Sequence, residues 1–355
     1  MDRKTRILHV IDDKKFLVYC ERTFSLSDLE NTYCSAKDFK KYITENIFDI
    51  VVVHYLTEES ITVLNSVNIR PPVIWFFWGS DAFCLGRFYN RFLLPKTKYI
   101  RLKLSFKKGI LNGLVNTIKL ILPTLVDRRQ YYQELIKSFE KVAIVVPIVP
   151  DDFKLLYDNY CIKSTPFHLS YINPVFDLKN PFDIQGDDIL VGNSASLSNN
   201  HIEIIDILSK ANIYNNRIVI PLSYGDKVYA SYVERYAKKK LRNVCCLTNF
   251  LPFSEYQNII ESCSIIIMNH LRQQALGNIV QALLSGAHLY MQPSSTVSKY
   301  LKENNFYFSN VNSNLILRPL TADERKVNRD RCIEVFGKET QHAKVAQLIQ
   351  KALQL

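Results

Sequence analysis

The sequence predicts an α/β protein made of two similar domains, each with parallel strands that alternate with helices. At 355 residues the chain is long enough for about two domains. Short apolar runs rich in β-branched residues recur along it, and segments with apolar residues at helical spacing separate them. Residues 173–186 contain two prolines, a glycine and no clear period, which is typical of a linker between two such series.

The first series begins near the start of the chain. It predicts strands over residues 6–11, 49–54, 72–77, 141–146 and 167–172. Trp78, Gly79 and Asp81 follow the third of these strands, at the carboxyl edge where open α/β sheets bind ligands. Asp81 is therefore a candidate general base or an acceptor for a substrate hydroxyl, and an N-cap of the next helix is the structural alternative. His9 is a second candidate base, although a histidine within a strand is more often a core residue.

Basic residues are concentrated in one part of the chain, within residues 87–132. Eleven Lys or Arg side chains and one acidic side chain lie between Arg87 and Arg129, which gives this part a charge of +10 and leaves +1 for the rest. Residues 110–126 in its second half have apolar residues at helical spacing. A basic, amphipathic helix of this kind is typical of a helix that lies on an anionic membrane surface. A core helix beside a solvated basic face is the alternative, and no nucleic-acid-binding motif accompanies the charge.

The second series predicts strands over residues 188–191, 217–221, 243–248, 264–268 and 287–291. Helices are expected over residues 228–240, 254–263 and 275–284, with Gly286 at the C-cap of the last of these and a final helix over 338–355. The first strand runs into a loop of small residues that begins at Gly192. A strand, a loop of small residues and a helix start form a cradle for a phosphate or a sugar.

A second loop in this series points to anion binding. It precedes the helix over residues 275–284 and carries Arg272 with the amides Gln273 and Gln274. Free N–H groups and the helix dipole attract anions at a helix N-terminus, and an arginine adds a charge that matches phosphate oxygens. Gly277 would let a ligand approach the backbone. An ordinary strand–helix–strand crossover with a surface arginine is the alternative.

The cysteines and the hydropathy of the chain indicate where in the cell the protein is expected. The eight cysteines are scattered without a CxxC pair, which favours a reducing compartment. The N-terminal residues lack the apolar core of a signal peptide, and no stretch has 18 consecutive apolar residues.

Four strings of residues resemble glycosyltransferase family 56. They are IWFFWGSDAF at 74–83, ILVGNSASLSNNHIEII at 189–205, IVIPLSYG at 218–225 and LRQQALGNIVQALLSGAHLYM at 271–291. The resemblance implies a GT-B glycosyltransferase fold, in which two Rossmann-like domains face each other across a cleft. It also implies a dTDP-sugar donor, an acceptor linked to undecaprenyl diphosphate, and a peripheral position on the cytoplasmic face of the bacterial inner membrane. Neither a metal ion nor another cofactor is expected.

The expected domains follow from this resemblance. Residues 1–172 would face the acceptor and the membrane, with 87–132 as a basic insertion, and residues 187–337 would bind the donor. The helix at 338–355 would close the cleft.

The sequence pattern and the resemblance together give the candidate site residues. Arg272 would stabilise the leaving diphosphate, while Asp81 and His9 are the candidate bases, and Trp78 and Gly79 would contact the acceptor with Asp81. The donor-binding candidates are Gly192, Asn193, Ser194, Ser198, Asn199, His201, Pro221, Tyr224, Arg272, Gln273, Gln274, Gly277 and Asn278. The membrane-binding candidates are Lys103, Lys107, Lys108 and Lys119.

One departure from related sequences affects the donor. Many GT-B enzymes have two glutamates eight residues apart across the helix that corresponds to 275–284, and this chain has Gln273 and Gln281 there. Recognition of the ribose is therefore open. Two other functions also remain open at this point. One is a GT-B nucleotide-sugar epimerase, and the other is a membrane-associated nucleotide-sugar-binding protein without catalysis.

Overall fold

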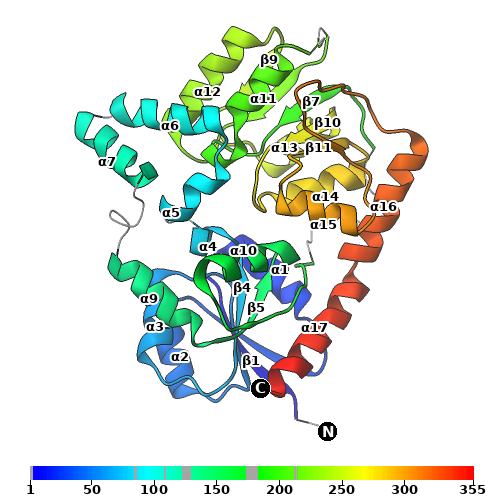
Figure 1. Ribbon diagram of the computed structural model, residues 1–355. Helices are drawn as coiled ribbons and strands as arrows, with labels where there is room; N and C mark the ends of the chain where they lie inside the picture. The colour runs from blue at the N-terminus through cyan, green and yellow to red at the C-terminus, as the bar shows by residue number, and fades with distance from the viewer. Residues whose placement is uncertain are drawn as a thin grey trace. The chain divides into compact units, whose positions relative to one another are not determined.

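The computed structural model in Figure 1 describes residues 3–83, 86–107, 109–121, 129–172, 183–211, 213 and 215–355. The chain forms two compact units and passes back and forth between them. Unit 1 consists of Met1–Leu85, Asp127–Val175 and Glu334–Leu355, and unit 2 consists of Gly86–Val126 and Phe176–Ile333. Each unit is built around one parallel sheet of six strands, as the alternating apolar and amphipathic segments predict.

The sheet of unit 1 has the strand order β2-β1-β3-β4-β5-β6. Its strands are β1 (Thr5–Val10), β2 (Leu29–Cys34), β3 (Ile50–Val53), β4 (Val73–Phe77), β5 (Val142–Pro147) and β6 (Thr165–Pro166). Every pair is parallel. From β1 the chain first crosses to β2 on one side and then returns to β3 on the other side. The direction of the crossovers therefore changes between β1 and β3. In open α/β sheets this switch point is where the carboxyl ends of strands bind ligands.

The helices of unit 1 cover both faces of its sheet (Figure 1). They are α1 (Lys14–Thr23), α2 (Phe39–Glu45), α3 (Glu58–Ser66), α4 (Ser80–Phe83), α9 (Arg129–Phe139), α10 (Pro150–Tyr160) and α17 (Lys338–Leu353). Val345 and Leu348 of α17 are fully buried against core residues of β1 and β3 such as Ile7 and Val52. The final helix thus completes the core of unit 1, instead of forming a separate closing element after the second domain.

The sheet of unit 2 has the order β12-β11-β10-β7-β8-β9. Its strands are β7 (Asp188–Val191), β8 (Ile218–Pro221), β9 (Val244–Leu247), β10 (Cys263–Met268), β11 (His288–Met291) and β12 (Ser309–Asn310). The helices after these strands are α11 (His201–Leu208), α12 (Lys227–Lys240), α13 (Phe253–Glu261), α14 (Leu276–Ser285), α15 (Thr296–Glu303) and α16 (Ala322–Phe336). The switch point lies between β7 and β10, whose following loops are the two that the sequence singles out.

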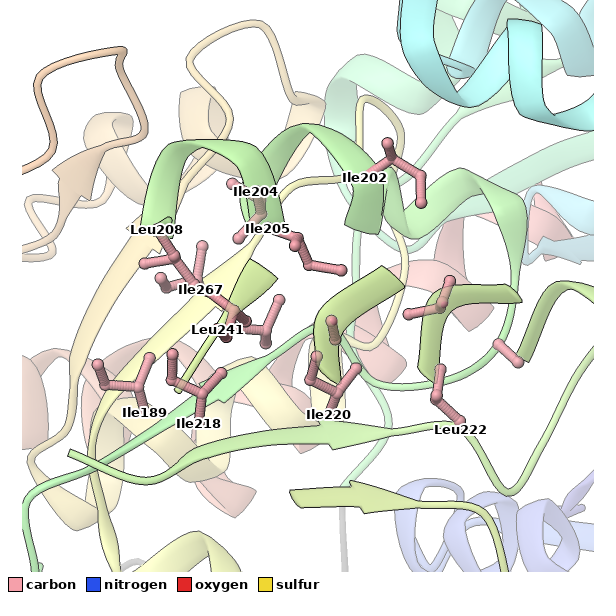
Figure 2. Packing of buried hydrophobic residues seen from close by; sticks show 14 of the residues in the cluster. Ile189, Ile202, Ile204, Ile205, Leu208, Ile218, Ile220, Leu222, Leu241 and Ile267 are labelled. Carbon is pink, nitrogen blue, oxygen red and sulfur yellow. The ribbon is translucent and has the colours of Figure 1, made fainter. Parts of the chain in front are cut away.

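β-Branched residues form the centre of unit 2. Figure 2 shows Ile189 of β7, Ile218 of β8 and Ile267 of β10 packed beneath Ile204 and Leu208 of α11. Stiff branched side chains pack well on a pleated surface, which is why these short runs form strands. Burial of this cluster fixes the position of β7 relative to β10 and therefore the spacing of the loops at their carboxyl ends.

The basic segment belongs to unit 2, which differs from the domain boundaries expected from the sequence. It forms α5 (Gly86–Tyr89), η1 (Asn90–Phe92), α6 (Pro95–Lys107) and α7 (Ile110–Ile121). Ile100 and Leu104 of α6 enter the core of unit 2. The backbone N–H and the hydroxyl of Thr97 donate to the Glu203 carboxylate at 2.9 and 2.6 Å. The basic segment therefore belongs to unit 2 because it packs against α11.

Local differences between the predicted and observed elements are few. Residues 167–172 are not a strand, and the sixth strand is the short β6 before them. The edge strands β2 and β12 were not predicted. The expected linker at 173–186 lies largely outside the described residues.

Candidate functional site

The loop after β7 is folded tightly upon itself. Gly192 has a φ of 69°, and a Cβ at this position would lie 2.7 Å from Nε2 of His201 and 3.0 Å from Oδ1 of Asn199. Only glycine fits here, because both the left-handed backbone and the space exclude a side chain. Asn199 accepts a hydrogen bond from the Asn193 N–H at 3.3 Å and donates to the Ser194 carbonyl at 3.0 Å. The strand therefore ends in a rigid turn with its small side chains at the sheet edge.

Gln274 joins this loop to the loop after β10. Its Oε1 accepts a hydrogen bond from the Ser198 hydroxyl at 2.6 Å, and its Nε2 donates to Oδ1 of Asn193 at 3.1 Å. Asn200 adds a second connection, because its Nδ2 donates to the carbonyl of Asn269 at 3.1 Å. The two loops that follow β7 and β10 thus form one polar surface at the switch point, as their places at the ends of neighbouring strands predict.

Helix α14 begins at this surface without a side-chain cap. Ala275 is the N-cap residue, has a φ of 57°, and offers no oxygen to the first N–H groups of the helix. Those donors and the positive end of the helix dipole are available to an anion. Arg272, three residues before the N-cap, stacks over the Phe92 ring at 5.9 Å and donates from Nη1 to the Gln273 carbonyl at 2.9 Å. A cation is thus held beside an uncapped helix start.

Other predicted donor-binding residues occupy different environments. Tyr224 is 80% exposed on the loop after β8, where its carbonyl accepts the Ala195 N–H at 2.6 Å. Pro221 ends β8 in the core. Asn278 donates to the Tyr256 hydroxyl at 3.1 Å. Gly277 is exposed in the first turn of α14 and Gln273 is buried.

His201 is a core residue instead of a surface ligand. It is fully buried at the start of α11, and burial lowers the pKa of its imidazole to about 3. The ring lies directly beneath Gly192 and 5.8 Å from the ring of Tyr229. It therefore stays neutral at physiological pH and supports the β7 loop from below. A single histidine after a polar loop does not reveal this orientation in the sequence.

Unit 1 has a pocket of about 270 Å³ at its own switch point. Its lining is mostly aromatic and aliphatic with a few polar groups, as is usual for small-molecule sites. The lining residues are Val10, Ile11, Asp12, Asp13, Phe16, His54, Tyr55, Thr57 and Trp78. Trp78 packs edge to face on Phe16, with ring centroids 4.0 Å apart. The prediction of Trp78 as a site residue thus coincides with a pocket, whereas Asp12 and Asp13 were missed although they directly follow the first strand.

Asp81 is buried next to this pocket region and does not line it. Its side chain is 1% exposed, and Oδ2 accepts a hydrogen bond from Nε1 of Trp75 at 2.9 Å. Burial raises the pKa of the carboxyl to about 7, an effect that the hydrogen bond from Trp75 and nearby backbone N–H groups oppose. Its position in the first turn of α4 favours a structural role over contact with a substrate. Gly79, which precedes that turn, has a φ of 88°.

His9 is also inside the core. Its Nδ1 lies 2.9 Å from Nε2 of His54, and its Nε2 lies 2.9 Å from Oδ1 of Asn31. Burial lowers the pKa of His9 to about 4. Because both ring nitrogens contact other side chains and the residue does not line the pocket, His9 is not positioned to take a proton from a substrate there.

The basic segment presents exposed apolar side chains beside its lysines. Ile110 and Leu111 of α7 are 76% and 75% exposed, and Leu114 and Ile118 continue the same helix with exposed side chains. Lys103 and Lys107 of α6 are exposed. Lys108 and the side chain of Lys119 lie outside the described residues. Among the residues that the structure describes, no helix has both the length and the apolar character needed to cross a bilayer.

Comparisons with known proteins agree with this architecture. Residues 173–323 match the family model described as 4-alpha-L-fucosyltransferase glycosyl transferase group 56. A crystal structure of a glycosyltransferase from Rickettsia africae superposes with a TM-score of 0.61 at 11% identity, over 99% of each chain. Sucrose-phosphate synthase from Thermosynechococcus elongatus gives 0.61 at 8% identity over 99% of each chain. Anabaena Alr3699/HepE in complex with UDP-glucose gives 0.59 at 9% identity, over 98% of this chain and 99% of that one.

At such low identities the structural matches establish the fold, while the family model covers the segment that carries both switch-point loops of unit 2. The fold class expected from the sequence is confirmed, and the expected family is the one whose model matches. The chain has the GT-B fold of glycosyltransferases, and its residues 173–323 match the model of glycosyl transferase group 56.

Proposed function

We propose that this enzyme transfers a deoxy-amino sugar of the 4-acetamido-4,6-dideoxygalactose type from a dTDP-linked donor. The acceptor would be an oligosaccharide linked to undecaprenyl diphosphate, in the synthesis of a surface polysaccharide such as a common antigen or an O-antigen. The resemblance to group 56 supports the sugar and the lipid carrier. The observation that carries the proposal is the cationic, uncapped start of α14 beside the loops joined by Gln274.

The donor diphosphate fits the chemistry of that surface. Negative charge grows on the diphosphate as the glycosidic bond breaks, so preorganised donors and a fixed cation lower the barrier. The N–H groups at the start of α14 and the guanidinium of Arg272 supply these groups. The hydroxyl of Ser198 and the amide of Gln274 would orient the donor without adding negative charge.

The acceptor sugar would occupy the pocket of unit 1. Aromatic rings from Phe16, Tyr55 and Trp78 suit the apolar faces of a sugar, and carboxylates suit its hydroxyls. Asp13 lines this pocket with an exposed carboxylate, whereas Asp81 is buried against Trp75. Asp13 is therefore the preferred candidate for the base that accepts the proton of the attacking hydroxyl, in place of the predicted Asp81.

The lipid carrier would bring the enzyme to the cytoplasmic face of the inner membrane. Lys103 and Lys107 beside the exposed apolar face of α7 support binding to an anionic bilayer. The amphipathic helix would bury its apolar face at the lipid boundary while the lysines approach the headgroups. A peripheral position of this kind needs no spanning helix.

The direct test is transfer by the purified protein from the dTDP-linked sugar to a lipid-linked acceptor, followed by mass spectrometry of the lipid product. We expect transfer with the dTDP donor and much slower transfer with the UDP form. Isomerisation of the donor without an acceptor would instead show an epimerase. Donor binding without any turnover would show a non-catalytic binding protein, and either result would contradict the proposal.

The role of Asp13 is tested with isosteric variants. Asp13→Asn should retain donor affinity, measured by calorimetry, and should lower kcat by roughly 10²-fold or more, on the scale of general-base catalysis. Asp12→Asn is the matched control, because Asp12 is a neighbouring exposed carboxylate that lines the same pocket. Equal losses in the two variants would point to pocket shape instead of proton transfer.

A further inference from the structure

Three side chains that can bind metal ions converge inside unit 1. They are His9 of β1, Cys20 of α1 and His54 directly after β3. Sγ of Cys20 lies 3.5 Å from Nδ1 of His9 and 3.2 Å from Nε2 of His54, and the two nitrogens are 2.9 Å apart. The three side chains are 0%, 0% and 2% exposed. The cluster belongs to unit 1, and its existence does not depend on the proposed function.

The outer nitrogens of both imidazoles are held by hydrogen bonds. Nε2 of His9 bonds to Oδ1 of Asn31 at 2.9 Å, and Nδ1 of His54 bonds to the Tyr171 hydroxyl. Nδ2 of Asn31 donates to the Phe24 carbonyl at 2.9 Å, which fixes the orientation of the amide. Imidazoles that bind metals nearly always have such a partner on the other nitrogen, because it sets the tautomer and the ring orientation.

One proton can join the two inner nitrogens, and the thiol hydrogen then lacks an acceptor within the cluster. Oδ1 of Asn31 can only accept, so Nε2 of His9 carries the proton and Nδ1 presents a lone pair. If Nε2 of His54 donates to that lone pair, the Cys20 thiol has no other lone pair within the cluster. If the thiol donates to Nε2 of His54 instead, two lone pairs face each other at 2.9 Å. A cation at the centre would accept all three lone pairs at once.

We propose that His9, Cys20 and His54 bind a zinc ion in unit 1 through Nδ1, Sγ and Nε2. Zinc bonds of about 2.0–2.1 Å to nitrogen and about 2.3 Å to sulfur separate tetrahedral ligand atoms by roughly 3.3–3.6 Å. The separation of 3.5 Å between Cys20 and His9 falls in this range, and those of 3.2 and 2.9 Å to and between the other atoms are shorter, so the side chains would move apart by a few tenths of an ångström to accommodate the ion. Two imidazoles and one thiolate are a ligand set that suits zinc.

The protonation states are compatible with metal binding. Burial lowers the pKa of both histidines, which keeps their imidazoles neutral and able to coordinate. Burial also raises the pKa of the Cys20 thiol well above its ordinary value, so the metal-free thiol keeps its proton. Binding would therefore convert the thiol to a zinc-bound thiolate and release that proton to solvent. His54 also lines the pocket of unit 1.

The ion would have three protein ligands, and water would complete its tetrahedral shell. It would join β1, α1 and β3 behind the pocket wall formed by Val10, Phe16 and His54. The pairing of β1 with β3 and the packing of α1 would be reinforced by one set of metal–ligand bonds, and a ligand that binds only the folded chain stabilises it. The pocket wall would be stiffened as a consequence.

The test uses the whole protein, first stripped with a chelator and then titrated with Zn²⁺ or Co²⁺. We expect one equivalent to bind, with a rise in Tm, release of about one proton per ion and, for Co²⁺, a thiolate-to-cobalt charge-transfer band in the near ultraviolet. No charge-transfer band and no change in Tm for the wild-type protein would overturn the proposal.

Variants assign the binding to this cluster. Cys20→Ser and His54→Gln should lose the band and the rise in Tm. Cys34→Ser should retain both, because Cys34 is another buried thiol of unit 1 that lies outside the cluster. Far-UV circular dichroism of each metal-free variant checks that it is folded. Identical bands in the wild-type protein and Cys20→Ser would place the metal elsewhere and contradict the proposal.

Discussion

The hydroxyl of Ser198 donates to Oε1 of Gln274 at 2.6 Å, and this contact joins residues 76 positions apart at the switch point of unit 2. The same glutamine donates to Asn193 at 3.1 Å, so it connects the loop after β10 to two points of the loop after β7. Both loops contribute to the predicted donor site. Their relative position therefore depends on this amide together with the contacts between Asn200 and Asn269.

Removing this bridge should weaken donor binding. Gln274→Ala loses both hydrogen bonds and should raise the donor Kd, with about 0.5–1.5 kcal/mol lost for each bond. Ser198→Ala should cost less, and the double variant should cost less than the sum of the two, because the side chains share one contact. Calorimetry with the dTDP-linked sugar measures the donor Kd of the wild-type protein, the two single variants and the double variant. Strictly additive losses would show that the two side chains act independently.

Arg272 should act on the chemical step. Arg272→Ala should lower kcat/KM by roughly 10²-fold or more, the scale of losing one preorganised electrostatic donor. Arg272→Lys should recover only part of this loss, since an ammonium lacks the planar fork of the guanidinium. Arg242→Ala is the control, because Arg242 is exposed and precedes β9 at the opposite edge of the sheet. Normal turnover of Arg272→Ala at saturating donor would refute this role.

Asp81 should make stability depend on pH in a defined direction. Its carboxyl has a pKa of about 7 in the folded protein against 3.8 ordinarily, so the folded state holds the proton more strongly. The free energy of unfolding should therefore fall as pH rises from about 4 to about 7, by up to about 1.4 kcal/mol for each unit of pKa shift.

Asp81→Asn removes this dependence, because the amide does not ionise. Urea unfolding of both proteins between pH 4 and 8 gives the difference, in which the contributions of the buried histidines cancel. The hypothesis that Asp81 contacts the acceptor predicts a different result for the same variant. If Asp81 contacts the acceptor, Asp81→Asn should lose transfer and keep its donor affinity. Normal transfer by this variant would show that Asp81 has only a structural role.

Binding to anionic vesicles should need both the lysines and the apolar face of the basic segment. Each lysine near the surface contributes about 1 kcal/mol, and this term weakens as salt rises. Flotation should thus decrease for Lys103→Gln with Lys107→Gln, and for Leu111→Ser, whose side chain is 75% exposed. The exposed lysines Lys37 and Lys40 of unit 1, changed to glutamine, are the control.

A short water-soluble acceptor separates docking from catalysis. The lysine and leucine variants should still use it, since the proposed chemistry lies at the switch points of the sheets. Flotation that responds neither to salt nor to these substitutions would leave the basic segment as a solvated surface.

The sheet cores were predictable because central strands are almost wholly apolar. The run Ile265–Met268 fits only a buried strand, and its observed bounds differ by one residue from those predicted. Edge strands lack this signal. β2 has the sequence LENTYC, with three polar residues, and only its pairing with β1 makes it a strand.

Some backbone groups find partners that a sequence does not reveal. The predicted strand at 167–172 is irregular because Ser170 N–H donates to Oε1 of Gln341 at 2.7 Å and Ile172 N–H donates to Oγ1 of Thr23 at 2.8 Å. Side chains distant in the sequence thus accept the hydrogen bonds that a neighbouring strand would otherwise accept. Membership of the basic segment in unit 2 depends likewise on Glu203, which bonds Thr97 106 positions earlier.

The candidate site was predictable in its loops and not in its side-chain directions. Asn193, Ser198 and Gln274 follow strands that become neighbours, so their proximity follows from the topology. Asp81 and His9 also lie at strand ends, yet each points into the core. A sequence shows which edge a residue occupies, whereas burial depends on the packing of several elements at once.

Ile7 of β1 and Val345 of α17 belong to one hydrophobic core, and this sets the order of events during synthesis. A ribosome adds about 5–20 residues per second, so roughly 20 to 70 s pass between the appearance of β1 and that of α17. All of Phe176–Ile333 is made within this interval. We therefore expect unit 2 to fold first on the nascent chain, while the apolar strands of unit 1 wait for their last helix and remain targets for chaperones. The half of the enzyme that begins the chain should be the half that matures last.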